Sequence, residues 1–514
     1  MIQLNAPWLE NYGEVPKTLD YPDYSMSEAV INTANSMPND TALAFMGRKI
    51  KYSLLKKNIE LTARSLSAIG VKADSRVTVC LPNIPQAVYS LYGINRIGAI
   101  ASMIHPLSAI KEIEFYLNEV ESETIIALDS FYDKIKEAII NTKVKKVIVV
   151  SISDELSAIK SVAYRLTSER ENPPIEYSDK VIKWNDFISK GKSYTGEYVK
   201  NKKAGEGAVI LFSGGTTGVT KGILLSNLNF NALAAQTVAM CNRQVRGKKM
   251  LAAMPVFHGF GLGVCVHTML YEGGCSVLVP RFNVKSYAQL IKKIRPNYIA
   301  GVPTLYEALT KNPYMDGVKL DCLMGVFSGG DSLSPALKKR FDKFLSDHDS
   351  DVVIREGYGT TECVTASCLT PYHMESEGSI GFPFPDTYYK ICKIGTNEEV
   401  PYGIEGEICL SGPTVMIEYI NQPEENAQTL QNYEGRIWLH TGDLGVMDEQ
   451  GFVYFKQRIK RVIITNGYNV YPSQIEGVLD AHKAVQMSCV IGVKDEYKMQ
   501  RVKAFVSLRD GFMP

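Results

Sequence analysis

Short apolar segments of strand-like composition alternate along this chain with longer segments of helical periodicity. The strand candidates span 76–81, 146–150 and 208–212, and the clearest helix candidates span 50–69 and 333–345. A helix that connects two strands returns the chain so that the strands lie parallel, so this alternation is typical of α/β proteins. We therefore predict an α/β fold rich in parallel sheet. In the second helix, Ser334 is the expected N-cap and Pro335 the first helical residue.

The length of 514 residues predicts at least two domains, because a single hydrophobic core does not grow to this size. Residues 448–451 have the composition of a turn, 452–455 that of a strand, and the basic run 456–461 follows. We place a boundary there, which gives a large domain over 1–457 and a small α+β domain over 458–514. The polar stretch 168–205 is interpreted as a surface excursion.

The charges are balanced, with 56 Lys plus Arg against 55 Asp plus Glu. No overall field therefore draws the chain to nucleic acid or to anionic lipid, and small molecules are the expected partners. The first residues lack the basic and apolar regions of a signal peptide, and no apolar run is long enough to span a bilayer. We expect a soluble, cytoplasmic protein with no membrane span.

The ten cysteines are scattered, most of them in apolar stretches. No CxxC pair occurs, and the seven histidines do not stand near cysteines or acids at zinc spacing. We predict reduced, buried thiols with a structural role.

A glycine- and hydroxyl-rich segment over 211–222 follows an apolar strand and carries a single lysine. Glycines let backbone N–H groups approach phosphate oxygens, hydroxyls add donors, and the lysine adds a mobile positive charge. The spacing is not that of a Walker loop, since Thr220 and Gly222 stand where glycine and a hydroxyl residue would be required. A flexible turn is the alternative. The predicted phosphate-binding residues are Ser213, Gly214, Gly215, Thr216, Thr217 and Lys221.

This segment resembles the phosphate loop of the adenylate-forming superfamily, which joins acyl-CoA synthetases, luciferase and the adenylation domains of peptide synthetases. Gly214 and Thr220 depart from the usual pattern, in which a hydroxyl residue and a proline are common. The lysine and the paired threonines are retained. The loop is therefore still expected to hold phosphate.

A second segment, 355–362, resembles the family's Gly-Tyr-Gly-x-Thr-Glu motif. The resemblance implies that Tyr358 stacks on adenine, that Thr361 bonds the α-phosphate and that Glu362 binds Mg²⁺. An aromatic face suits a purine, and a carboxylate is the hard oxygen ligand that Mg²⁺ prefers. Gly357 belongs to the same predicted nucleotide site, as does Glu356, which replaces a common glutamine.

Two further segments follow in the order that the family requires. Residues 441–443 resemble its Thr-Gly-Asp motif, in which the acid, here Asp443, accepts hydrogen bonds from the ribose hydroxyls. Residues 457–476 resemble its hinge motif, which implies that Arg458 contacts ribose or phosphate and that Lys460 is the pivot. Gly467 would line the channel for the pantetheine arm. Four motifs in order, over nearly the whole chain, identify it as a member of this superfamily.

The segment 255–263 bears on the choice of carboxylic acid. It resembles the segment between the phosphate loop and the acyl pocket in fatty-acid and aryl-acid ligases. His258 would face the bound carboxylate or gate the pocket; a packed core histidine is the alternative. No acidic residue occurs from Met254 to Tyr271, which disfavours α-amino acids, whose ammonium group needs one. Gly329 and Gly330 resemble the loop that flanks adenine. The chain length and aromaticity of the acid stay open.

The resemblance implies ATP-dependent activation of a carboxylic acid as acyl-AMP, followed by transfer to coenzyme A, with Mg²⁺ as cofactor. Transfer to the pantetheine of a carrier protein and a non-catalytic nucleotide-binding module are the alternatives. The predicted catalytic residues are Thr217, Lys221, His258 and Glu362. The family's C-terminal lysine motif is missing from the sequence, so we expect the small domain to be incomplete and adenylation by this chain to be slow.

Overall fold

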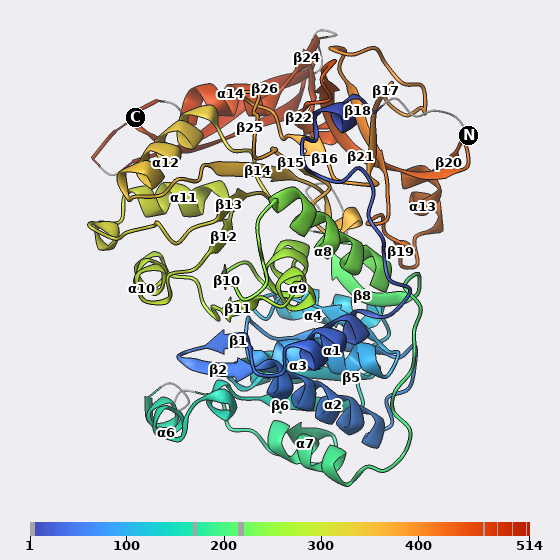
Figure 1. Cartoon of the computed structure of the whole chain (residues 1–514). Coiled ribbons are helices and arrows are strands. Elements are labelled where there is room, and N and C mark those ends of the chain that lie inside the picture. Colours follow the sequence, from blue (N-terminus) through green and yellow to red (C-terminus); the bar gives the residue numbers. More distant parts are fainter. Residues whose placement is uncertain are drawn as a thin grey trace.

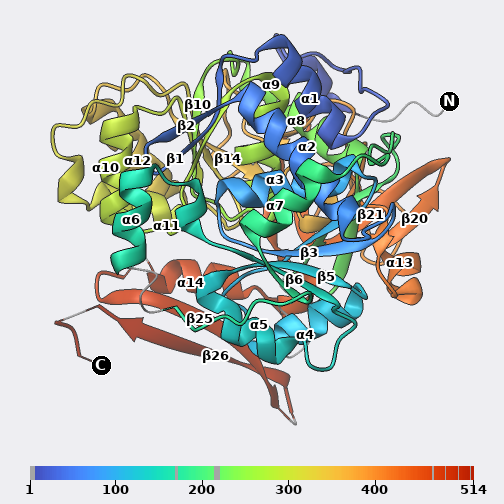
Figure 2. The ribbon, with the colours of Figure 1, turned by 90° about the horizontal axis from the view of Figure 1, so that it is seen from below.

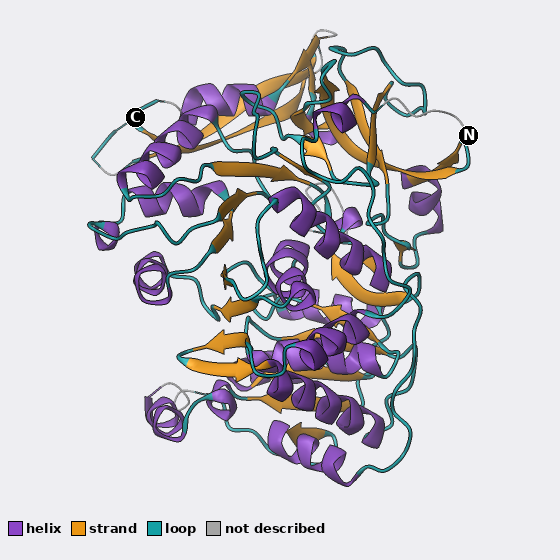
Figure 3. Cartoon of the chain, viewed as in Figure 1, coloured by secondary structure: helices purple, strands orange, loops and turns teal. Residues whose placement is uncertain are grey.

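The computed structural model describes residues 6–167, 172–213, 220–465, 468–480, 482–495, 497–509 and 511–513. Two large sheets with their covering helices make up most of the molecule, and the last elements of the chain lie together at one end (Figures 1 and 3). The mixed α/β class predicted from the sequence is confirmed. None of the described helices combines the length and the apolar character needed to cross a bilayer.

The first large sheet has eight strands in the order β19-β9-β8-β4-β3-β5-β6-β7, and those from β8 to β7 run parallel. Figure 2 shows α2, α3 and α7 on one face of this sheet and α4 and α5 on the other. The strands are β3 (Arg76–Cys80), β4 (Ile100–Met103), β5 (Thr124–Leu128), β6 (Lys146–Val150), β7 (Val181–Lys183), β8 (Gly207–Phe212), β9 (Gly222–Ser226) and β19 (Glu418–Tyr419). The helices are α2 (Tyr52–Ala68), α3 (Pro85–Arg96), α4 (Ile110–Glu119), α5 (Tyr132–Ala138) and α7 (Trp184–Ser193), with α6 (Ala158–Thr167) at the periphery.

The second large sheet has nine strands in the order β16-β15-β14-β13-β12-β10-β11-β1-β2, parallel from β14 to β1. The strands are β1 (Thr41–Phe45), β2 (Arg48–Lys51), β10 (Lys249–Ala252), β11 (Cys275–Leu278), β12 (Tyr298–Gly301), β13 (Gly325–Ser328), β14 (Ile354–Tyr358), β15 (Cys368–Leu369) and β16 (Phe382–Pro383). The helices that alternate with these strands from residue 227 on are α8 (Asn227–Cys241), the π-helical η5 (Phe260–Thr268), α9 (Met269–Glu272), α10 (Val284–Ile294), α11 (Pro303–Thr310) and α12 (Pro335–Asp347).

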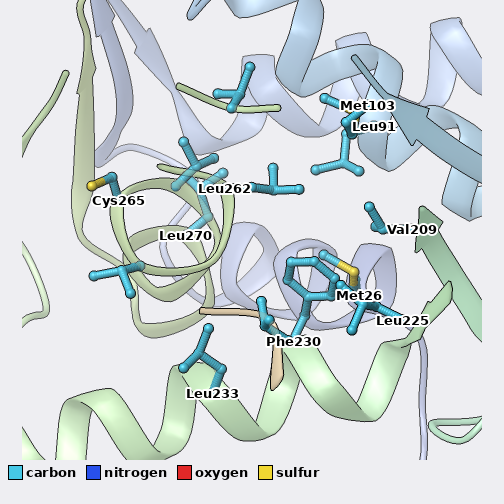
Figure 4. Close-up of a cluster of buried hydrophobic side chains, with 14 of the residues drawn as sticks. Met26, Leu91, Met103, Val209, Leu225, Phe230, Leu233, Leu262, Cys265 and Leu270 are labelled. Carbon is cyan, nitrogen blue, oxygen red and sulfur yellow. The ribbon is translucent and has the colours of Figure 1, made fainter. Parts of the chain in front are cut away.

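A continuous apolar core joins the two sheets (Figure 4). Leu91 from α3 and Val209 from β8 belong to the same buried cluster as Phe230 from α8 and Leu262 from η5. Met26 from α1 (Met26–Ser36) completes this part of the core. Because each fully buried apolar side chain of this size contributes roughly 1.5–3 kcal/mol, the cluster fixes the two sheets relative to each other.

Two antiparallel sheets complete the fold. One contains β17 (Tyr388–Cys392), β18 (Gly406–Ser411), β20 (Leu430–Tyr433), β21 (Arg436–Met447) and β22 (Val453–Arg458), with α13 (Pro423–Thr429) beside it. The other contains β23 (Ile463–Thr465), β24 (Tyr468–Val470), β25 (Val485–Asp495) and β26 (Met499–Leu508), with α14 (Pro472–Asp480) packed against β25. The predicted small C-terminal α+β domain is thus confirmed, whereas its boundary at 457/458 stays a prediction.

The helices and strands expected from the sequence agree closely with the structure. All three strand candidates form strands, and the Ser334 hydroxyl accepts the Leu337 N–H as an N-cap. The helix expected over 50–69 begins only at Tyr52, because Ile50 pairs with Leu43 in the β1–β2 hairpin. Eight of the ten cysteines are buried and all ten are free, but Cys489 is exposed and Cys322 is half-buried.

The interpretation of 168–205 as a surface excursion is wrong for its central part. Residues 181–193 form β7, which adds to the edge of the first sheet, and α7, which packs against α2. Trp184 and Phe187 are buried on the inner face of α7. The many lysines and glutamates of the flanking segments masked this short apolar pattern. Residues 168–171 lie outside the described part of the chain.

Truncation of a core side chain on α7 tests this correction. We expect Phe187→Ala to lower the free energy of unfolding by about 3–5 kcal/mol, because Phe187 is fully buried. The matched control Phe282→Ala, at a side chain that is 42% exposed, should cost less than about 1 kcal/mol. Urea denaturation measures both, and equal losses in the two variants would contradict the packing described for α7.

Candidate active site

The predicted site residues gather where the parallel strands of the two large sheets end. Ser213 follows β8, Gly329 and Gly330 follow β13, and Tyr358 is the last residue of β14. In α/β proteins, ligands bind at the carboxyl ends of parallel strands, because the loops there are free to vary while the strands hold them in place. The sheet containing β21 and β22 closes this region from the other side.

A buried carboxylate joins two sheets at the centre of the site. The Tyr358 hydroxyl on β14 donates to Asp443 Oδ2 on β21 at 2.7 Å, and Arg458 Nε on β22 lies 3.4 Å from Asp443 Oδ1. Asp443 and Arg458 face each other in the β21–β22 pairing. The ring of Tyr358 also packs against Phe455, with 5.8 Å between centroids.

The second oxygen of Asp443 is not hydrogen-bonded by any residue that the structure describes. Asp443 Oδ1 is buried, and the ion-pair contact with Arg458 Nε at 3.4 Å does not have hydrogen-bond geometry. The pKa of Asp443 is raised to about 6. Burial is the main cause and the nearby carboxylate of Glu362 contributes, while Arg458 and Tyr358 oppose the rise. An orphaned buried acceptor is costly and is typical of an oxygen that receives a donor from a ligand.

Glu362 lies in the 3₁₀ turn η7 (Thr361–Cys363), immediately after the β14 motif. Its Oε1 accepts the hydroxyl of Tyr419 at 2.7 Å, and its backbone carbonyl accepts the Met416 N–H. Thr361 is half-buried in the same turn. The carboxylate is therefore held by β19, an element far away in the sequence.

The turn that carries Glu362 ends in an unusual backbone conformation. Val364 has φ +67° and ψ −59°, and the Thr365 N–H donates to the Cys363 carbonyl. This is the γ-turn of positive φ, which is rare and strained for a β-branched residue. Gly259 packs against it so closely that a Cβ on Gly259 would lie 1.7 Å from the Val364 carbonyl oxygen. Backbone contact thus links the His258 segment to the Glu362 turn.

Lys221 lies at the start of β9 and is engaged by two side chains. Its ammonium forms an ion pair with Glu425 of α13 and sits 4.6 Å from the centroid of the Tyr419 ring. Ser213 and Lys221 close the base of the predicted phosphate loop, since the Ser213 N–H donates to the Lys221 carbonyl and the Ser213 hydroxyl accepts the Lys221 N–H. The loop residues Gly214, Gly215, Thr216 and Thr217 lie outside the described residues.

Glu356 and the glycine pair lie on neighbouring strand ends. Glu356 Oε1 accepts the Leu333 N–H at 2.9 Å, which ties β14 to the loop after β13. Burial raises the pKa of Glu356 to about 7, and nearby Asp331 adds to the rise. Gly330 has a φ of +81°, a conformation that glycine adopts without strain.

A mostly apolar pocket opens beside this loop. Its cavity volume is about 40 Å³. Ser328, Gly329, Gly330 and Gly357 form its strand-end wall. Its apolar lining comprises Phe260, Val264, Phe327, Ala366, Leu369 and Phe384.

His258 stands at the start of the segment that leads into the pocket-lining helix η5. Its ring is accessible to solvent but surrounded by protein, and this desolvation lowers the pKa of the imidazole. The Phe260 N–H donates to His258 Nδ1 at 3.2 Å. The neutral ring therefore carries its proton on Nε2. The alternative of a packed core histidine does not hold for His258.

The structure describes only one of the two remaining residues predicted in the hinge region. Lys460 is exposed in the turn η8 (Ile459–Arg461) that follows β22. Gly467 lies outside the described residues.

The fold also brings together three potential metal ligands that sequence spacing did not reveal. Atoms of Glu407, Cys409 and His440 lie within 4.8 Å of one another, on the neighbouring strands β18 and β21. Glu407 accepts the Gly442 N–H at 3.0 Å and lies 3.0 Å from His440 Nδ1. These hydrogen bonds fix the backbone on either side of Thr441, immediately before Asp443. The cluster supports the turn that presents Asp443.

Sequence reasoning missed three residues of this site, namely Tyr419, Glu425 and Phe455. None belongs to a motif. Tyr419 reaches the site only because β19 pairs antiparallel with β9, where Tyr419 is opposite Ile223. Phe455 falls on a strand that was predicted, but its partner Tyr358 is distant in the sequence.

Replacement of the buried acid tests its electrostatic cost. The pKa of Asp443 is raised when the chain folds, so its contribution to stability is complete below about pH 3.8 and is lost as the pH rises through 6. A rise from 3.8 to about 6 corresponds to about 3 kcal/mol. We expect Asp443→Asn to be more stable than the parent at pH 7.5 by up to that amount.

Urea denaturation at several pH values measures this difference. The gain should shrink between pH 7 and pH 4, because the parent's carboxyl group becomes protonated there. A difference that is independent of pH would contradict the assignment.

Comparisons with known proteins identify the family of the chain. Residues 31–420 match the model of the AMP-binding enzyme family, and residues 474–514 match that of the AMP-binding enzyme C-terminal domain. A long-chain-fatty-acid–CoA ligase of Bacillus subtilis is 33% identical over 520 residues, covering 99% of this chain and 90% of the relative. A probable 4-coumarate–CoA ligase 2 of Dictyostelium discoideum is 30% identical over 514 residues, covering 97% and 89%.

Solved structures share the fold at lower identity. The anthranilate CoA ligase AuaEII in complex with anthranoyl-AMP has a TM-score of 0.81 at 22% identity, covering 98% of this chain and 89% of its own. ATP-bound MatB from Rhodopseudomonas palustris has a TM-score of 0.80 at 23% identity, covering 95% and 90%. The family model matches most of the chain, and the relatives align with it over nearly their whole length. The chain therefore belongs to the AMP-binding enzymes, the adenylate-forming superfamily that its motifs resemble.

Proposed function

We propose that this chain is an acid–thiol ligase that activates a carboxylic acid with ATP as acyl-AMP and then transfers the acyl group to coenzyme A. One observation carries the proposal: Tyr358 donates to Asp443, the carboxylate of Glu362 lies near enough to Asp443 to raise its pKa, and Gly357 and Thr365, which stand close to Tyr358 and Glu362 in the chain, line an apolar pocket. We place the nucleotide on the first three residues and the acyl group in the pocket. The relatives named as fatty-acid and coumarate CoA ligases support the same reaction.

The ribose binds at Asp443. Its Oδ1, which no described residue hydrogen-bonds, accepts a ribose hydroxyl, and Arg458, which forms an ion pair with this oxygen, contacts ribose or phosphate. Tyr358 presents its ring to adenine while its hydroxyl stays on Asp443. Gly329, Gly330 and Gly357 leave room for a flat base to approach the backbone, and Glu356 holds the loop that covers it.

The triphosphate binds between the loop 213–221 and Glu362. Lys221, Thr216 and Thr217 neutralise the charge that builds as pyrophosphate leaves, Ser213 and the two loop glycines hold the backbone donors in place, and Thr361 bonds the α-phosphate. Glu362 is a hard oxygen donor held in a fixed orientation by Tyr419, which fits a magnesium ion. Mg²⁺ supplies charge neutralisation on the phosphate oxygens when bound.

The acid binds with its apolar part in the pocket and its carboxylate towards His258. The neutral imidazole donates from Nε2 to a carboxylate oxygen, which orients the other oxygen towards the α-phosphorus. The carboxylate then attacks this phosphorus, an acyl–O–P bond forms, and the bond to pyrophosphate breaks. The apolar lining and the absence of an acidic residue over 254–271 favour a neutral fatty or aryl group.

The second half-reaction transfers the acyl group to a thiol. The thiolate attacks the acyl carbonyl and AMP leaves with the bonding electrons. We propose that the small domain, from about residue 458, turns about Lys460 between the two half-reactions and that Gly467 lines the path of the pantetheine arm.

Pyrophosphate release across a panel of fatty, aryl and short-chain acids tests the proposal. We expect release with ATP and Mg²⁺ that requires an acid, together with hydroxamate when hydroxylamine replaces the thiol. Addition of coenzyme A should yield the thioester. A Glu362→Gln variant should lower kcat by about 10²-fold or more, because it removes charge stabilisation in the transition state.

The outcomes separate the alternatives. A thioester formed only on a pantetheine-loaded carrier protein would replace coenzyme A as acceptor. Nucleotide binding without pyrophosphate release or hydroxamate from any acid would contradict enzymatic activation and leave a nucleotide-binding module.

Lys221 forms an ion pair with Glu425. We therefore predict that the Glu425 carboxylate competes with the triphosphate of ATP for the Lys221 ammonium. We expect Glu425→Gln to bind ATP several-fold more tightly, because the ammonium is freed for phosphate. The neighbouring exposed residue gives the matched control Glu424→Gln, which should bind ATP as the parent does. Isothermal titration with ATP measures both, and weaker binding by Glu425→Gln would show that Glu425 helps to position Lys221 instead.

A further inference from the structure

Tyr419 is a single side chain that contacts two groups of the proposed phosphate site. Its hydroxyl donates to Glu362 Oε1 at 2.7 Å. Its ring faces the ammonium of Lys221, which lies 4.6 Å from the ring centroid. Lys221 and Glu362 are 141 residues apart in the chain. Because Tyr419 contacts both, it links the position of the ammonium to that of the carboxylate.

The position of Tyr419 is itself fixed from both sides. Its backbone N–H donates to Asn426 Oδ1 at 2.6 Å, and its carbonyl accepts Asn426 Nδ2 at 2.8 Å. Its strand pairs with β9, the strand that begins next to Lys221. Only 5% of Tyr419 is exposed, and burial followed by the nearby carboxylate of Glu362 raises the pKa of the phenol far above its ordinary value.

We propose that Tyr419 is a positioning residue that aims the Glu362 carboxylate and the Lys221 ammonium at the same phosphate group. The proposal rests on the proposed function, because it assigns both groups to the triphosphate. The hydroxyl leaves the second oxygen of the Glu362 carboxylate to meet a divalent cation, and the ring holds the ammonium by a cation–π contact. Partners that orient a metal ligand typically change metal affinity by 10–100-fold when they are lost.

The two contacts can be removed separately. Tyr419→Phe keeps the ring under Lys221 and deletes only the hydroxyl that holds Glu362. Tyr419→Leu deletes both contacts. The control Tyr433→Phe removes a hydroxyl from a tyrosine that is 40% exposed on β20.

Isothermal titration of the complete chain with ATP, in EDTA and in saturating Mg²⁺, distinguishes the two contacts. We expect Tyr419→Phe to bind ATP as the parent does in EDTA, but to lose about tenfold or more of the affinity that Mg²⁺ adds. The Leu variant should also bind more weakly in EDTA, because the cation–π contact no longer opposes the pull of Glu425 on the Lys221 ammonium. In pyrophosphate release, the Phe variant should need about tenfold more Mg²⁺ for half-maximal rate, with the KM of the acid unchanged.

The results that overturn this proposal differ from those that overturn the proposed function. If the parent releases pyrophosphate and Tyr419→Phe shows the same Mg²⁺ dependence as Tyr433→Phe, Tyr419 has no positioning role. An equal rise in the KM values of ATP and the acid, with no change in Mg²⁺ dependence, would also reject it by showing a general structural effect. A parent chain that releases no pyrophosphate with any acid rejects the proposed function instead.

Discussion

The hydrogen bond from Tyr358 to Asp443 is the interaction on which the rest of the site depends. It joins the end of a parallel strand in the nine-stranded sheet to an antiparallel strand that arrives 85 residues later. The carboxylate is buried there at a cost that its raised pKa reflects. Arg458 and the hydroxyl offset part of this cost, and a donor from bound ribose would offset more. A buried acceptor that lacks a hydrogen bond in the free protein favours binding of a ligand that donates one.

The proposed phosphate site is likewise assembled from segments that are distant in the sequence. Glu362 and Lys221 come from separate loops, and β19 brings Tyr419 between them. The strained turn at Val364 and its contact with Gly259 attach the Glu362 loop to the segment that carries His258. The proposed nucleotide and acyl regions are thus joined by direct backbone contact, which suits a reaction in which carboxylate and α-phosphorus must meet at close range.

Prediction from the sequence succeeded where the physical signal is local. Strands such as β6 are visible as short apolar runs, and the N-cap at Ser334 is a single hydroxyl residue next to a proline. The signal failed where it depends on pairing between distant strands. The position of Tyr419 in the site, and the cluster of Glu407, Cys409 and His440, depend on the pairing register of strands that are distant in the sequence. No local sequence pattern encodes these registers. The helix α7 was missed for another reason, because two buried aromatic side chains were hidden among many charged neighbours.

The proposal that ATP and a carboxylic acid react with each other on this chain is tested most directly by exchange of labelled pyrophosphate into ATP in the absence of any thiol. We expect exchange that depends on the acid, saturates with it and is abolished in Asp443→Ala. Exchange that proceeds equally well without an acid, or no exchange with any acid in a folded chain that binds ATP, would contradict it.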